Sequence, residues 1–259
     1  MITAGVDIGS ATTKAAIMEG GEILSWSLMS TGGDSEGIAV RAFDQALSLC
    51  RKSAADVKYT VATGYGRINA PFAHRIITEI SCHARGIQWF FPSVRTLLDM
   101  GGQDCKAIRC ENGKVLDFVM NDKCAAGTGR YLERVAAVLG VSLQEVGDLS
   151  SRIVEKPVPV SSYCTIFAED DILTFISQGK HANDILAGAC EAVVERVVSF
   201  LGRLGAMERD AAVSGGIAKN RGITSRLEAA LGFPCLIPPE PQIVGAVGAA
   251  LLARDGAVS

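Results

Sequence analysis

Two short segments of the sequence place an aspartate, glycines and a lysine at the same offsets. The first runs from Asp7 to Lys14 and the second from Asp99 to Lys106. In each, an apolar β-type run ends at the aspartate, a small-residue turn follows, and a second β-type run leaves the turn. Glycine lets the backbone come so close to an anion that its N–H groups can donate hydrogen bonds to it. The repeat therefore predicts two phosphate-binding hairpins that clamp a nucleoside triphosphate and its metal ion.

The side chains of the hairpins suggest separate roles in binding the metal ion, the attacking water and the phosphates. Asp7 and Asp99 would be direct or outer-sphere partners of Mg²⁺, and Gln103 and Asp104 could orient an attacking water, although a purely structural role suits the last two equally well. These four are the predicted catalytic residues. The predicted phosphate contacts are Gly9, Ser10, Ala11, Thr12, Thr13, Lys14, Gly101, Gly102 and Gln103.

A third segment, Val213 to Asn220, reads as a buried strand that stops at two glycines before a helix begins. Bare backbone and a helix N-terminus suit the nucleoside end of a ligand. A plain strand-to-helix turn is the alternative interpretation. The contacts predicted here are Gly215, Gly216, Ala218 and Asn220.

Two of the eight cysteines could carry a different chemistry. Cys124 and Cys164 each precede a helical pattern, so we expect both at helix N-termini, where the helix dipole favours the thiolate that ligates iron. By composition alone, such a cysteine is more often a core residue. A cubane iron–sulfur cluster normally takes four cysteines, so a twofold dimer would have to supply the second pair. Core or wall positions are expected for Cys50, Cys82, Cys105, Cys110, Cys190 and Cys235.

The order of the elements predicts an α/β protein with two lobes. Three antiparallel strands followed by alternating helix and strand occur twice. The expected strands are 2–8, 13–18, 22–28, 57–63, 75–78, 95–100, 104–110, 114–120 and 211–214, and the main helices are 35–53, one ending at 90, 183–204, 219–231 and 241–254. We expect one domain to comprise residues 1–93 plus 240–259 and the other residues 94–239.

Composition narrows the possible partners. The net charge is only −3 and the basic residues are scattered, which argues against a surface for nucleic acid or membrane. The chain begins directly with a β-type run, and the apolar run Ile243 to Ala253 is too short to span a bilayer. We therefore expect a cytoplasmic protein without disulfides that binds proteins and small molecules.

The sequence resembles the activator ATPases of 2-hydroxyacyl-CoA dehydratases, a family that includes the ATP-binding subunits of benzoyl-CoA reductase. The segments that carry the resemblance are Gly5–Lys14, Ala62–Arg67, Glu79–Ala84, Asp99–Lys106, Asn121–Arg130, Cys164–Glu169, Ser214–Asn220 and Gly245–Leu251. The resemblance implies two RNase H-like lobes of the acetate and sugar kinase, Hsp70 and actin fold, with a nucleotide cleft between them. It also implies a homodimer bridged by one 4Fe-4S cluster, with Cys124 and Cys164 as ligands. Gly127, Thr128 and Gln242 are added to the expected nucleotide contacts.

The activity that the resemblance implies is ATP-driven electron transfer. A reduced ferredoxin or flavodoxin would give one electron to the cluster, and hydrolysis of ATP to ADP would drive it at low potential to a partner enzyme. That partner could be a 2-hydroxyacyl-CoA dehydratase, an enzyme of the benzoyl-CoA reductase type or a double-cubane cluster reductase. Two other interpretations of the same fold are a small-molecule kinase and an actin-like assembly protein.

Overall fold

The computed structural model describes residues 1–121, 124–205 and 210–257. The chain divides into two compact units. The first unit comprises Met1–Leu97, Ile108–Phe118 and Ile237–Ser259, and the second comprises Leu98–Ala107 and Val119–Leu236. The domain boundaries expected from the sequence remain a prediction.

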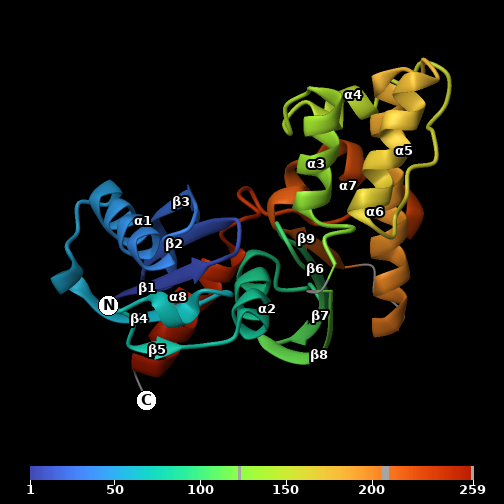
Figure 1. The fold of residues 1–259 in the computed structure, drawn as a ribbon. Coiled ribbons are helices and arrows are strands. Elements are labelled where there is room, and N and C mark those ends of the chain that lie inside the picture. Colours follow the sequence, from blue (N-terminus) through green and yellow to red (C-terminus); the bar gives the residue numbers. More distant parts are fainter. Residues whose placement is uncertain (122–123, 206–209, 258–259) are drawn as a thin grey trace. The chain divides into compact units, whose positions relative to one another are not determined.

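The sheet of the first unit follows the predicted strands closely. Its strands are β1 (Ile2–Ile8), β2 (Thr12–Glu19), β3 (Glu22–Ser30), β4 (Val57–Thr63) and β5 (Arg75–Ile76), in the order β3-β2-β1-β4-β5 (Figure 1). The β1–β2 and β2–β3 pairs are antiparallel, whereas β4 runs parallel to β1 and β5. Gly20 and Gly21 both have positive φ, which gives the tight turn between β2 and β3.

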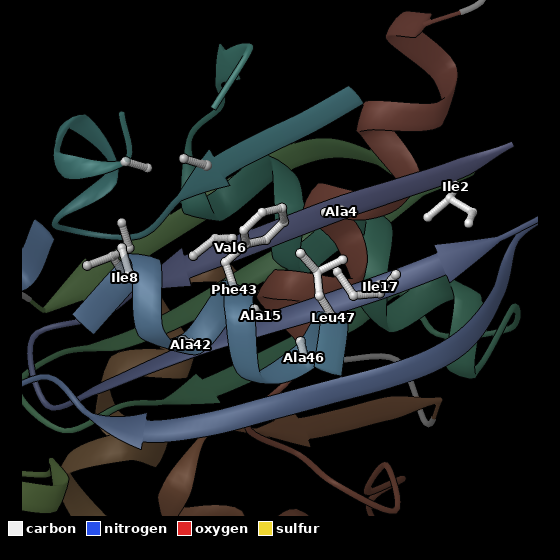
Figure 2. Close-up of a cluster of buried hydrophobic side chains, with 13 residues drawn as sticks. Ile2, Ala4, Val6, Ile8, Ala15, Ile17, Ala42, Phe43, Ala46 and Leu47 are labelled. Carbon is white, nitrogen blue, oxygen red and sulfur yellow. The ribbon is translucent and has the colours of Figure 1, made fainter. Parts of the chain in front are cut away.

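One apolar cluster joins this sheet to helix α1 (Ser35–Leu49). Figure 2 shows Val6, Ile17 and their neighbours on the strands packed against Phe43 and Leu47 of the helix. Each such buried side chain contributes roughly 1.5–3 kcal/mol to folding. The helix ends at Leu49 and not at residue 53 as predicted, because Arg51 takes a left-handed conformation with φ of 55°.

Two helices pack closely in the first unit, with glycines where their backbones meet. They are α2 (Glu79–Phe90) and α8 (Val244–Ala257), and α8 also packs on β1, β2 and β4. A methyl group added to Gly248 would overlap the backbone oxygen of Cys82, and one added to Gly5 would overlap that of Ala246. The backbones are therefore in direct contact. The last helix begins at Val244, later than the predicted residue 241.

A second sheet has the order β8-β7-β6-β9. Its strands are β6 (Thr96–Met100), β7 (Cys105–Glu111), β8 (Lys114–Asn121) and β9 (Ala211–Ser214). Asn112 and Gly113 connect β7 to β8 with φ of 51° and 74°, which confirms the hairpin predicted from the Asn-Gly pair.

Helices make up most of the second unit. They are α3 (Gly129–Leu139), α4 (Val146–Ser150), α5 (Thr165–Ser177), α6 (Ala182–Leu201) and α7 (Arg221–Leu231). The largely buried α6 packs against each of the other four. The predicted helix from residue 219 starts instead at Arg221, because the Asn220 side chain accepts a hydrogen bond from Ile223 N–H and caps it. Within the described chain, we find no helix with the length and apolar character needed to cross a bilayer.

Candidate functional site

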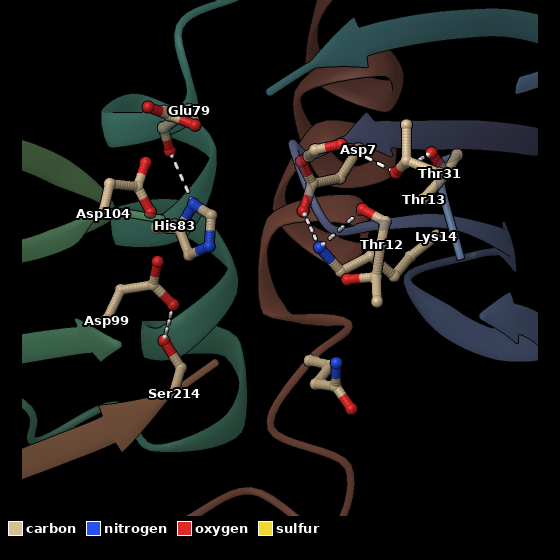
Figure 3. Close-up of polar contacts among 12 residues, drawn as sticks. Asp7, Thr12, Thr13, Lys14, Thr31, Glu79, His83, Asp99, Asp104 and Ser214 are labelled. Atoms are coloured by element: carbon tan, nitrogen blue, oxygen red, sulfur yellow. Dashed lines mark hydrogen bonds and ion pairs between the residues drawn. The ribbon is translucent and has the colours of Figure 1, made fainter. Parts of the chain in front are cut away.

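The first predicted phosphate turn joins β1 to β2. Asp7 is the next-to-last residue of β1 and pairs with Lys14 in the antiparallel register. Their side chains form an ion pair of 3.0 Å between Nζ and Oδ2, and both residues are buried (Figure 3). Gly9 N–H donates to Thr12 O at 3.0 Å and closes the turn.

The second predicted turn, in the other unit, repeats this pattern. Asp99 is the next-to-last residue of β6, and its Oδ2 lies 3.3 Å from Lys106 Nζ. Gly101 N–H donates to Asp104 O at 2.9 Å, the same offset as in the first turn. Each unit thus holds a buried carboxylate and ammonium beneath a small-residue turn. Such a pair offers an oxygen ligand for Mg²⁺ and a cation for phosphate.

The side chains of the first turn differ in accessibility. Gly9, Ser10, Ala11 and Thr12 are partly exposed and can meet a ligand. Thr13 is fully buried, and its hydroxyl lies 3.0 Å from that of Thr31, which in turn donates to Gly9 O at 2.7 Å. Sequence reasoning missed Thr31, because it directly follows β3 and lies outside any motif.

The second turn has an additional partner on β9. Ser214 Oγ donates to Asp99 Oδ1 at 2.6 Å, as Figure 3 shows, and Lys106 Nζ also lies 2.8 Å from Asp104 Oδ2. Asp104 is therefore part of the buried charge network rather than an isolated polar residue. Gln103 is exposed, and Gly101 and Gly102 are partly exposed.

The Gly215–Gly216 segment requires glycine for a structural reason. Gly215 has φ of 84°, and a methyl group there would overlap Met100 O at the end of β6. Gly216 begins a 3₁₀ turn over Gly216–Lys219, in which Ala218 is buried, and the Asn220 side chain caps α7. The segment therefore lies against the second turn.

Three further predicted contacts, Gly127, Thr128 and Gln242, lie just before the helices α3 and α8. Thr128 is buried at the N-cap of α3, and its hydroxyl donates to Ala125 O at 2.6 Å. Gly127 precedes it with φ of 82°. Gln242 is partly buried before α8 in the first unit, and its N–H donates to Glu240 Oε1 at 3.1 Å. Whether these residues contact a nucleotide stays a prediction.

Cys124 and Cys164 lie next to each other in the second unit. Cys124 Sγ donates to the backbone oxygen of Tyr163 at 3.6 Å, and both cysteines are partly exposed with free thiols. Cys164 is the N-cap of α5, as predicted. The prediction is wrong for Cys124, because the positive φ of Gly127 interrupts the chain and α3 starts only at Gly129. Neighbouring accessible thiols fit a pair of iron ligands.

The other cysteines differ in their surroundings. Burial raises the pKa of Cys82 to about 12, that of Cys110 to about 11, and those of Cys105 and Cys190 as well. Such thiols stay protonated near neutral pH and are poor metal ligands. Cys50 caps α1, and Cys235, whose pKa burial raises to about 11, lies outside the helices and strands; both are only partly buried.

Two residues of the Asn121–Arg130 segment, Asp122 and Lys123, lie outside the described residues. Asn121 Nδ2 donates to Cys124 O at 3.1 Å and holds the cysteine segment to the end of β8. In the described portion of the chain, we find no group of three or more His, Cys, Asp or Glu side chains suited to a metal ion.

Comparison with known proteins connects these features. The chain is 42% identical to the activator of lactoyl-CoA dehydratase of Anaerotignum propionicum, over 99% of both chains. The crystal structure of (R)-2-hydroxyglutaryl-CoA dehydratase component A of Acidaminococcus fermentans matches with a TM-score of 0.95 and 38% identity, covering 100% of both chains. The ADPNP-bound activator of 2-hydroxyisocaproyl-CoA dehydratase of Clostridium difficile matches with a TM-score of 0.91 and 38% identity, covering 100% of this chain and 96% of that one.

More distant structures share the fold alone. A ROK family glucokinase of Streptomyces griseus aligns with a TM-score of 0.59 at 16% identity, over 99% of this chain and 100% of that one. The predicted two-lobed α/β fold of the sugar kinase type is confirmed. The model of the BadF/BadG/BcrA/BcrD ATPase family matches residues 4–253, which is nearly the whole sequence. The chain therefore belongs to the BadF/BadG/BcrA/BcrD ATPase family.

Proposed function

We propose that this protein is an ATP-dependent activator of a 2-hydroxyacyl-CoA dehydratase. It hydrolyses ATP to ADP and delivers one electron at low potential from a 4Fe-4S cluster shared by two copies of the chain. The observation that carries the proposal is the pairing of two accessible thiols, Cys124 and Cys164, in the same unit as one of two matched phosphate turns.

The nucleotide would be held by the two turns. Asp7 and Asp99 would face Mg²⁺, while Lys14 and the turn backbones would face phosphate oxygens. Gln103 and Asp104 would orient the hydrolytic water. This assignment is supported by the matched ion pairs of 3.0 and 3.3 Å, because one geometry built twice suggests one kind of ligand.

The cluster would lie between two copies of the chain. Cys124 and Cys164 would provide two ligands and the second copy the other two, and the bound cluster would serve as a one-electron carrier. Support for a homodimer comes from α5, which carries apolar side chains next to Cys164. Ile166, Phe167 and Leu173 are 67%, 61% and 52% exposed, an apolar surface that suits a protein–protein interface.

The partner is proposed from the names of the relatives. Two of them are named as activators of lactoyl-CoA dehydratase and of 2-hydroxyisocaproyl-CoA dehydratase, so a 2-hydroxyacyl-CoA dehydratase is preferred over a benzoyl-CoA reductase type or double-cubane enzyme. A reduced ferredoxin or flavodoxin would supply the electron in the cytoplasm. The kinase interpretation has less support, since the glucokinase shares only 16% identity.

The proposal can be tested with anoxically purified protein. Mixed with MgATP, a reduced low-potential donor and a purified 2-hydroxyacyl-CoA dehydratase, it should start dehydration, and omission of ATP or of the donor should prevent it. Two results would contradict the proposal: transfer of the ATP γ-phosphate to a metabolite, which indicates a kinase, and nucleotide-dependent filaments of a protein without iron, which indicate an assembly protein.

A further inference from the structure

The second phosphate turn is bonded directly to the element that follows Cys124. Gly129 N–H donates to Gly101 O at 3.0 Å, and Arg130 N–H donates to Gly102 O at 2.8 Å. Both donors belong to the first turn of α3, and both acceptors belong to the turn between β6 and β7. A movement of the Gly101–Gly102 backbone must therefore move the start of α3 or break these two bonds.

The Gly101–Gly102 turn and the start of α3 are closely packed. Gly129 lies so close to Gly102 that an added methyl group would come within 3.2 Å of its Cα. A contact between packed backbones transmits a displacement because such an interface cannot compress. The short segment between Cys124 and Thr128 then links the start of α3 to the first cysteine, and the Thr128 hydroxyl holds the segment at Ala125 O.

A second set of contacts joins α3 to the segment that carries Cys164. Arg134 donates two hydrogen bonds to Glu169 of α5, Nε to Oε2 at 2.8 Å and Nη2 to Oε1 at 2.9 Å. Tyr131 Oη donates to Ser161 O at 3.0 Å, and Tyr131 is almost fully buried. The two-pronged Arg–Glu pair fixes direction as well as distance.

We propose that these contacts form a mechanical link between the second phosphate turn and the two cysteines. The inference rests on the proposed function and adds a path to it. The path runs from Gly101 and Gly102 to the start of α3, and from α3 through Tyr131 to Ser161 and through Arg134 to Glu169 of α5. Occupancy of the turn by a nucleotide changes the position of its carbonyls and thereby the surroundings of Cys124 and Cys164. Tyr131, Arg134 and Glu169 are positioning residues in this scheme.

The geometry divides the effect between the two cysteines. Cys124 is connected to the turn through the backbone before α3, whereas the side chains of α3 reach the Cys164 segment through Tyr131 and Glu169. Removing those side-chain contacts should weaken the nucleotide dependence of Cys164 much more than that of Cys124, because the hydrogen bond from Cys124 to the backbone oxygen of Tyr163 remains as a weaker link to the Cys164 segment. A merely structural role for these residues would change both cysteines or neither.

The test measures thiol alkylation in cluster-free, reduced protein. Rates at Cys124 and Cys164 are followed by peptide mass spectrometry with iodoacetamide, without nucleotide, with ADP and with a non-hydrolysable ATP analogue. Coupling of the usual strength predicts that nucleotide changes each rate by about 5-fold or more. In the combined variant Tyr131→Phe, Glu169→Gln the ratio of the alkylation rates with and without nucleotide should fall towards one at Cys164 and keep its wild-type value at Cys124.

Glu133→Gln is the matched control, because Glu133 also pairs with an arginine of α3 but within the same helix, at 2.6 Å from Arg130 Nη1. This variant should keep the wild-type ratio of alkylation rates with and without nucleotide at both cysteines. The charge-reversed pair Arg134→Glu, Glu169→Arg should restore nucleotide dependence at Cys164 relative to Glu169→Gln. Nucleotide affinity and thermal unfolding of every variant are measured in parallel.

The link is refuted if the combined variant keeps the wild-type ratio at Cys164, or if Glu133→Gln loses it equally. Wild-type protein that binds nucleotide and iron, but whose thiol rates ignore the nucleotide, overturns the link and leaves the proposed function standing. Wild-type protein that binds neither nucleotide nor iron overturns both the link and the proposed function.

Discussion

The thiol of Cys124 lies 3.6 Å from the backbone oxygen of Tyr163 and donates a hydrogen bond to it. Tyr163 directly precedes Cys164, so two partly exposed cysteines that lie far apart in the sequence come into neighbouring positions. The side chain of Tyr163 is itself largely exposed, and the apolar surface of α5 continues from it. The pair therefore lies where a second copy of the chain could reach it.

The apolar surface of α5 leads to a prediction about assembly. Phe167→Glu should convert the proposed homodimer into single chains, because it places a charge in the centre of an apolar contact. Sedimentation velocity measures the change. Leu49→Glu, at a 62% exposed position of α1, serves as the control and should leave the assembly intact. An unchanged dimer in Phe167→Glu would show that the copies meet elsewhere.

The two buried ion pairs should respond unequally to loss of their aspartate. Asp7→Asn leaves Lys14 buried beside a neutral amide, and breaking such a pair costs about 3–5 kcal/mol of unfolding free energy. Asp99→Asn should cost less, about 1–3 kcal/mol, because Lys106 keeps Asp104 at 2.8 Å. Urea denaturation of both variants gives the comparison. Equal losses of unfolding free energy would mean that Asp104 does not compensate the charge of Lys106.

Gly215 offers a test of backbone geometry. Gly215→Ala should lower the unfolding free energy by about 2 kcal/mol or more, because φ of 84° strains an L-residue and the methyl group overlaps Met100 O. Gly202→Ala is the control, since its φ is −55° and no atom lies near the added methyl group. That variant should be neutral or slightly more stable. Chemical denaturation compares them, and equal stability would contradict the assigned geometry.

The geometry of the two turns proposed to bind phosphate was the most predictable part of the candidate site. Asp7, Gly9 and Lys14 share their offsets with Asp99, Gly101 and Lys106, and a spacing of this kind survives folding because each turn closes locally. Strands β1 and β4 were also predicted to the residue, since β-branched and apolar runs bounded by turns define them.

Contacts between distant segments could not be predicted from the sequence. Ser214 approaches Asp99 only because β9 joins the second sheet beside β6, and nothing in the sequence around Ser214 specifies that neighbour. The pairing of Arg134 with Glu169 likewise depends on how α3 packs on α5. The start of α3 was misjudged because a cysteine before an apolar pattern looks like a helix start, whereas Gly127 and Thr128 set the actual boundary.

Asp184 predicts a specific pH dependence of stability. Burial works to raise the pKa of its carboxyl, but the N–H donors of Val154, Glu155 and Lys156 outweigh burial and hold the pKa below its usual value. A depressed folded pKa contributes stability that is complete above the unfolded pKa of about 3.9 and is lost as pH falls through the folded pKa.

The measurement is the urea midpoint of wild type and Asp184→Asn between pH 2 and 7. The variant should be less stable at pH 7, and the difference should shrink as the pH falls below about 4. A difference that stays constant over this range would show that the carboxylate charge does not contribute.

The most direct measurement is iron and acid-labile sulfide per chain in anoxically purified protein, with the molecular mass in solution. We predict about four irons for every two chains in wild type, and loss of that iron in Cys124→Ser and Cys164→Ser with nucleotide binding retained. Cys50→Ser, which alters a cysteine at the end of α1, should keep its iron. Single chains without iron, or a Cys124→Ser variant with its full iron content, would contradict the shared cluster.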